Sequence, residues 1–280
     1  MIADWKTPTS KWLEPTVTVE TGSFRTGLNG SWGVFRGELR RWFGWHGVFH
    51  IVVWSAVIAW ILFASVFSSA PIFDGLGFET LVNLLSVIPP IVGIALVTAA
   101  VCGGYHNGET AWVIGKPVPR AGQLLATITG LWAGIVATTI VVPALIAYWW
   151  LPNSDPYRFV IPQTPPIGRY LMALGGLSLV LAFFMAFAAL LSVVVRRRSA
   201  VLVVSIWALM MLRIPIAYAE WFDFTPARLI RTDILPGGWA EYTEYINGAV
   251  LDAGSAVWGT LGLTALFLAG AILAFRRLEL

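Results

Sequence analysis

Long apolar segments separated by short polar ones set the overall pattern of this chain. Six segments stay mostly apolar over about 20 residues, the length at which an α-helix crosses the hydrocarbon core of a membrane. We predict six membrane-spanning helices with these approximate boundaries: 47–68, 80–103, 121–150, 170–195, 199–218 and 255–275. The fold class expected is therefore an all-α membrane protein. A six-helix transmembrane domain (47–275) follows a polar N-terminal segment (1–30), and a short tail (276–280) ends the chain.

A different pattern precedes the first span, in residues 31–46. Apolar residues recur there at helical spacing, whereas arginines fall mostly off that stripe. The apolar positions are Trp32, Phe35, Leu39, Trp42 and Phe43, and the basic ones are Arg36, Arg40 and Arg41. This pattern is typical of an amphipathic helix that lies in the membrane interface with its basic face toward lipid phosphates. Glycines within the segment lower its helix propensity, so a flexible basic anchor is the alternative. We favour the interfacial helix.

The positions of the basic residues predict an orientation. Thirteen of the 18 Lys and Arg residues fall before the first span, between spans two and three, between spans four and five, or after the sixth. Cytoplasmic segments of membrane proteins carry an excess of Lys and Arg. Both termini are therefore predicted in the cytoplasm, and the protein is expected in the plasma membrane as a multi-pass protein. The polar first 30 residues lack the apolar run of a signal peptide.

Composition supports this class. Hydrophobic residues make up 58% of the 280 residues and charged residues only 12%, about half the charge of a soluble domain. The single cysteine, Cys102, lies in an apolar run and is predicted to be a packing residue.

The connection between spans five and six is rich in aromatic residues. It covers residues 219–254 and holds several Trp, Tyr and Phe residues together with prolines. Trp and Tyr favour the boundary between membrane and water. We expect short re-entrant helices here before the last span, shielded by protein because exposed backbone is not tolerated in lipid.

Prolines and glycines inside the spans predict local features of the bundle. Pro89 and Pro90 lie in the middle of span two, and Pro143 lies in span three. Each removes a backbone hydrogen bond, which predicts a kink or a break. Gly130 and Gly134 form a G-x-x-x-G pattern, which allows two helices to approach closely.

Motifs for catalysis or nucleotide binding are missing from the sequence. Gly115-Lys116 is followed by proline, so the chain has no P-loop. His46 and His50 share a helix face but have no acidic residue near them, so packing is favoured over metal binding. We expect no catalytic residue, no metal and no cofactor on this chain, and no enzymatic activity of its own.

Arg213 is the exceptional charge within a predicted span. A membrane-embedded charge is a functional hypothesis by default. Arg213 lies near the outer end of span five, from which its side chain can reach the surface. The surface position is the favoured interpretation.

The loop between spans two and three is the most informative predicted cytoplasmic segment. A short helix from about 109 to 114, followed by prolines, would protrude and could contact a partner protein. An ordinary ordered loop fits the residues equally well. The candidate contact residues are Gly108, Glu109, Trp112, Lys116, Pro117 and Arg120.

At this point the sequence resembles a family: the permease subunits of ABC transporters of the type-2 exporter class. Four features match in order. They are the basic helix at Gly37–Arg41, the loop with Gly108, Pro117 and Arg120, the short arginine turn Arg196, Arg197 and Arg198, and a proline-containing segment before span six followed by Arg276 and Arg277. The match covers about residues 31–280. It departs from the family where Gly104 replaces a frequent acidic residue and Glu109 replaces a frequent threonine.

The resemblance implies a set of partners. Two such permease subunits, identical or homologous, would pair around a pathway, and two separate ATP-binding-cassette ATPase subunits would bind beneath them. ATP and Mg would bind to those ATPase subunits. The segment at 109–114 would couple ATP-driven closure to tilting of the spans and so move an apolar or amphipathic substrate. Membrane lipid is a further expected partner, and nucleic acid is not. The alternatives are a structural or assembly subunit of a larger membrane complex, without transport, and, ranked low, a membrane-embedded enzyme.

Overall fold

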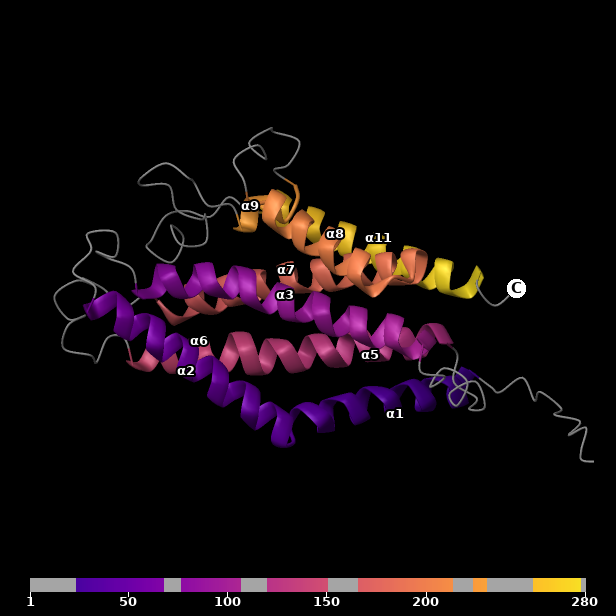
Figure 1. Cartoon of the computed structure of the whole chain (residues 1–280), viewed down its shortest axis with the longest axis horizontal. Coiled ribbons are helices and arrows are strands. Elements are labelled where there is room, and N and C mark those ends of the chain that lie inside the picture. Colours follow the sequence, from indigo (N-terminus) through magenta and orange to yellow (C-terminus); the bar gives the residue numbers. More distant parts are fainter. Residues whose placement is uncertain are drawn as a thin grey trace, which may run out of the picture.

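The protein is helical throughout the part that the structure describes. A computed structural model describes residues 24–67, 77–106, 120–150, 166–213, 224–230 and 254–277. No β-strand occurs in these ranges. Figure 1 shows the long helices packed lengthwise into one elongated bundle.

The long helices coincide with the apolar segments. Five of the six predicted spans each hold one helix: α2 (Trp45–Phe67), α3 (Gly77–His106), α7 (Ile167–Val195), α8 (Arg198–Met211) and α11 (Gly254–Arg277). The remaining predicted span, 121–150, is built from α5 (Arg120–Ile135), the π-helix η2 (Val136–Val141) and α6 (Val142–Trp150).

Four of these segments are long and apolar enough to cross a membrane. They are Leu84–Gly103, Ala121–Trp149, Ile167–Val195 and Gly254–Phe275. Two shorter apolar helical stretches, Gly47–Val57 and Arg198–Met211, accompany them within the described ranges.

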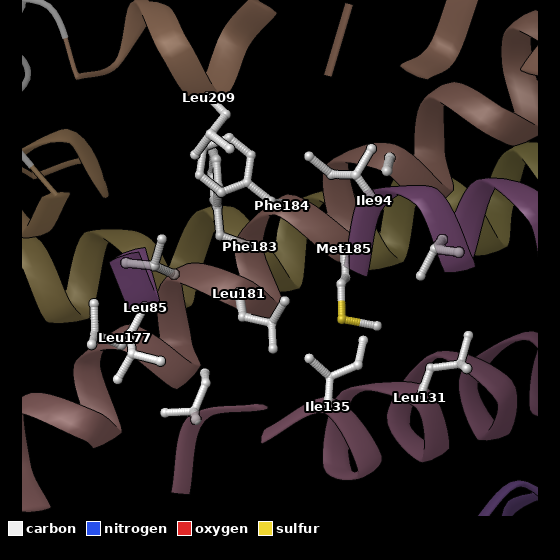
Figure 2. Packing of buried hydrophobic residues seen from close by; sticks show 14 of the residues in the cluster. Leu85, Ile94, Leu131, Ile135, Leu177, Leu181, Phe183, Phe184, Met185 and Leu209 are labelled. Carbon is white, nitrogen blue, oxygen red and sulfur yellow. The ribbon is translucent and has the colours of Figure 1, made fainter. Parts of the chain in front are cut away.

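Helix α7 forms the centre of the bundle. It packs against α3, α8 and α11, and 16 of its 29 residues are buried. A helix that is apolar on all sides is a buried one. Figure 2 shows the core around it, where side chains of α3 (Leu85, Ile94), α5 (Leu131, Ile135) and α8 (Leu209) meet Leu181 and its neighbours on α7.

Polar side chains inside the bundle bond to backbone carbonyl oxygens of neighbouring helices. The Tyr170 hydroxyl on α7 donates to the Ala144 oxygen of α6 over 2.8 Å. The Trp132 indole N–H on α5 donates to the Ser178 oxygen of α7 over 2.9 Å. Cys102 is a free, buried thiol, as predicted for a packing residue. Buried polar groups need such partners, because an unpaired one costs free energy in an apolar interior.

The predicted effect of the prolines differs between the two spans. Helix α3 continues without interruption through Pro89 and Pro90, and both prolines are buried. The break foreseen as one alternative therefore does not occur, and a kink at these prolines stays a prediction.

In span three, Pro143 comes directly after the π-helix. The Val142 N–H bonds to the Ala137 oxygen, five residues back. A proline ring clashes with the carbonyl four residues before it. The wider π-turn is how the helix continues at this proline, since one extra residue per turn moves that carbonyl away.

Two further helices, α1 and α9, complete the described chain. Helix α1 (Phe24–Trp42) confirms that the amphipathic segment is helical, and it begins seven residues before the predicted start at 31. Helix α9 (Ala227–Ile230) lies in the segment where short helices were expected. Ala227 and Leu229 are buried and α9 packs against α7, whereas re-entry into a membrane stays a prediction.

Candidate functional site

The predicted coupling loop is described only at its two flanks. Gly108, Glu109, Trp112, Lys116 and Pro117 lie outside the described residues. The chain enters that loop from the end of α3 at His106 and leaves it at Arg120, the first residue of α5. Helices α3 and α5 pack against each other, so any force applied to the loop acts on two helices in contact.

Helix α1 packs on the glycine face of α5. An added methyl group at Gly130 would lie 2.8 Å from the Glu38 Cβ, and one at Gly134 would overlap the indole ring of Trp42. From the first contact to the second, the chain advances by four residues on α5 (Gly130 to Gly134) and by four residues on α1 (Glu38 to Trp42). The two helices therefore run parallel at this contact. The G-x-x-x-G pattern predicted a close helix contact, and α1 is the helix that makes it.

Trp42 is the anchor of this contact. Its side chain is only 6% exposed, and its ring also lies against the His50 ring of α2, with 5.0 Å between centroids. One aromatic side chain thereby joins α1, α2 and α5.

The elbow between α1 and α2 depends on one glycine. A methyl group at Gly47 would overlap the backbone carbonyl of Trp42. The Gly47 N–H bonds to the Gly44 oxygen over 3.0 Å. Because a carbonyl group of the backbone cannot move aside as a side chain can, only glycine fits at position 47 while the backbone keeps this course.

The apolar stripe of α1 divides between protein and surface, and the position of α1 in the membrane interface stays a prediction. Trp42 is buried on α5, and Phe35 and Leu39 are half-buried. Trp32 and Phe43 are 61% and 73% exposed. Because a lipid tail and a glycine-lined helix face are both apolar, the pattern along α1 cannot distinguish them. The three predicted basic residues, Arg36, Arg40 and Arg41, are exposed as expected.

The arginine turn is confirmed as a tight connection between α7 and α8. Arg196 has φ 56° and ψ 7°, and its N–H bonds to the Ser192 oxygen over 3.2 Å. Arg197 is extended and Arg198 begins α8. All three side chains are exposed. A left-handed residue at a helix end reverses the chain in two residues, which places α8 antiparallel to α7.

Arg213 is half-buried, and its position at the membrane surface stays a prediction. Its guanidinium donates a 2.6 Å hydrogen bond to the Ser86 hydroxyl on α3. Ser86 is 4% exposed. The bond joins the end of α8 to α3 one turn before the proline pair, and it is the polar contact that sequence reasoning missed.

Other residues of the site also had little signal in the sequence. Gly47 looks like any glycine before an apolar run, and the Glu38 Oε2 atom is buried without a hydrogen-bond partner among the described residues. The role of Gly47 becomes visible once the elbow between α1 and α2 is seen, and that of Glu38 once α1 is placed on α5. Across the described ranges, no group of three or more His, Cys, Asp or Glu side chains is arranged to hold a metal ion.

These features define the class of the protein. Four helices long and apolar enough to span a membrane, in an all-helical bundle, are those of a multi-pass membrane protein. Neither the models of known protein families nor the curated proteins include a match to this chain.

Proposed function

We propose that this protein is the membrane-spanning permease subunit of an ATP-driven exporter of the type-2 ABC class. In this proposal it does not hydrolyse ATP. Two separate ATPase subunits bind ATP and Mg and also bind the segment at 109–114. Their ATP hydrolysis drives the movement of an apolar or amphipathic substrate. A second permease subunit completes the pathway.

The observation that carries the proposal is the packing of α1 against α5. Helix α5 starts at Arg120, where the proposed coupling loop ends. Ten residues further, about 15 Å along the helix, Gly130 begins the contact with α1. A push on the loop would thus reach α1, and through the Gly47 elbow α2, by contacts between packed helices. Switching requires contacts that differ between two states, and rigid helices joined at an elbow can supply them.

The proposed topology has six spans with both termini in the cytoplasm. Helix α2, with 23 residues, is about 35 Å long and can cross a hydrocarbon core of about 30 Å. Helix α8 has 14 residues and belongs to a proposed span that continues to 218. Figure 1 supports the arrangement, because the end of α3, the start of α5 and the end of α11 lie at the same end of the bundle.

Affinity purification of the full chain from its native membranes in mild detergent tests the proposal, with identification of every bound protein. We expect a P-loop ATPase among them and ATP hydrolysis in the eluate. Glu109→Arg should remove that ATPase, and Pro117→Ala should weaken its binding. Glu244→Arg, a charge reversal in the predicted outer segment, is the matched control and should retain it.

A native assembly that contains no nucleotide-hydrolysing chain would overturn the proposal. It would favour the alternative, a structural or assembly subunit without transport.

A further inference from the structure

The seam between α3 and α8 carries Arg213. Its Nη1 atom donates to the Ser86 hydroxyl, and among the described residues this is the one hydrogen bond of the guanidinium. No carboxylate of the described residues pairs with it. A guanidinium has five N–H donors in a planar fork that matches phosphate and carboxylate oxygens. Arg213 is half-buried, so its guanidinium is only partly removed from water, and an anionic oxygen beside it would gain charge-assisted hydrogen bonds.

An apolar stripe along α8 leads up to this arginine. Val203, Trp207 and Met210 are 68%, 61% and 36% exposed. They follow one another by four and three residues, so they lie along one face of the helix. Arg213 comes three residues after Met210 and four after Leu209, which is fully buried. Arg213 lies in the turn directly after α8 and is half-buried, between the buried Leu209 and the exposed apolar face.

The dimensions of the stripe fit one leaflet of a membrane. Ten residues separate Val203 from Arg213, which corresponds to about 15 Å along a helix. That is half of a hydrocarbon core of about 30 Å. A cation at one end and apolar side chains over the length of an acyl chain are complementary to an amphiphile with an anionic headgroup.

We propose that the α3–α8 seam binds a phospholipid with a net negative headgroup. Arg213, oriented by Ser86, holds the phosphate group, and one acyl chain lies along Val203, Trp207 and Met210. A zwitterionic lipid is disfavoured, because its ammonium group would lie near the guanidinium. The site is independent of the proposed transport function, since it requires neither ATP nor a partner protein.

Native mass spectrometry of the purified full chain in detergent tests this site, with dioctanoyl phosphatidylglycerol and dioctanoyl phosphatidylcholine as the probes. We expect the phosphatidylglycerol to be bound about tenfold more tightly, the effect of one charge-assisted contact. Arg213→Gln should abolish that preference. Arg169→Gln is the matched control and should keep it. Arg169 is in the first turn of α7, at the same end of the bundle as Arg213, because α7 and α8 are antiparallel.

Two further variants keep the test independent of folding defects. Ser86→Ala leaves the charge in place but removes its hydrogen-bond partner, and should weaken phosphatidylglycerol binding a few-fold. Trp207→Ala should weaken both lipids equally, because it contacts only the acyl chain.

Four results would overturn the proposal. The first is equal retention of the two lipids by the wild type, and the second is an equal loss of binding in the Arg169 and Arg213 variants. The third is displacement of phosphatidylglycerol by millimolar inorganic phosphate, which would indicate a site for a free anion. The fourth is a change of oligomeric mass rather than of lipid retention in Arg213→Gln, which would indicate a surface covered by a second copy of the chain.

Discussion

Single glycines decide where α1 sits. Gly130 and Gly134 leave space that Glu38 and Trp42 occupy, whereas Gly175 on α7 has no other atom within 4 Å of its missing side chain. The same residue type therefore has opposite roles at these positions. At Gly134 it permits a contact, and at Gly175 it only lowers the helix propensity of α7.

Gly134→Ala should destabilise the protein by about 1–3 kcal/mol, the usual cost of overpacking a filled contact. The overlapped atoms belong to the base of the Trp42 ring, which cannot rotate away while α1 stays in place. Gly175→Ala is the matched control and should be neutral or stabilising by up to about 1 kcal/mol. Thermal unfolding in detergent measures both. Equal stability of the two variants would contradict this description of the contact.

Arg196 is the residue with positive φ among the described non-glycine residues. A side chain in that conformation costs about 1–2 kcal/mol, so Arg196→Gly should stabilise the protein by about 1 kcal/mol relative to Arg197→Gly. Both variants remove one positive charge from the same turn, but Arg197 has φ −108° and gains no steric relief. The midpoints of thermal unfolding give the comparison. A higher midpoint for the Arg197 variant would contradict the left-handed cap.

At the scale of elements, the Gly47 elbow and the π-turn before Pro143 set helix directions. At the elbow, a side chain on residue 47 would meet the backbone carbonyl of Trp42. The π-turn is stabilised by Thr138 and Thr139, whose hydroxyls donate to the oxygens of Gly134 and Ile135 over 2.8 and 2.7 Å. The π-turn continues the helix of span three, whereas the elbow separates α1 from α2.

Gly47→Ala should weaken the packing of α1 on α5, because the added methyl group forces the Trp42 backbone to move. Trypsin reports this, since Arg36, Arg40 and Arg41 lie on α1 and are cleaved only when the helix opens locally. A cost of about 1–3 kcal/mol corresponds to a roughly five- to 150-fold rise in the cleavage rate. Gly33→Ala has open space around its new methyl group and should slow cleavage slightly. Unchanged cleavage in the Gly47 variant would show that the elbow is not rigid.

At the scale of the whole molecule, the proposed six-span topology places the α7–α8 turn and the start of α11 on opposite sides of the membrane. Ser199 and Ser255 are exposed at these two places. In a Cys102→Ala background, Ser255→Cys should react with a membrane-impermeant maleimide in intact cells. Ser199→Cys should react only after permeabilisation. Labelling of both positions from the same side would exclude this topology.

The wild-type protein is a further control for that experiment. Its single cysteine, Cys102, is buried, and its thiol lies 3.9 Å from the Ser192 oxygen. It should not react from either side while the protein is folded.

The sequence by itself determined which segments are helices, and most helix ends lie within a few residues of the predicted ones. The reason is that an apolar run long enough to cross a membrane has to satisfy its backbone hydrogen bonds internally, which depends on local composition alone. The arginine turn and the packing of Cys102 were predictable on the same basis.

Only the tertiary structure decided what those helices face. Trp42 could have contacted lipid or protein, Arg213 could have pointed to the surface, and Gly47 had no distinguishing neighbour in the sequence. In a membrane both environments of an apolar side chain are apolar, so hydrophobicity does not select between them. The selection comes from shape, as where the Trp42 ring fits over Gly134, and from hydrogen bonds between distant residues, as between Arg213 and Ser86.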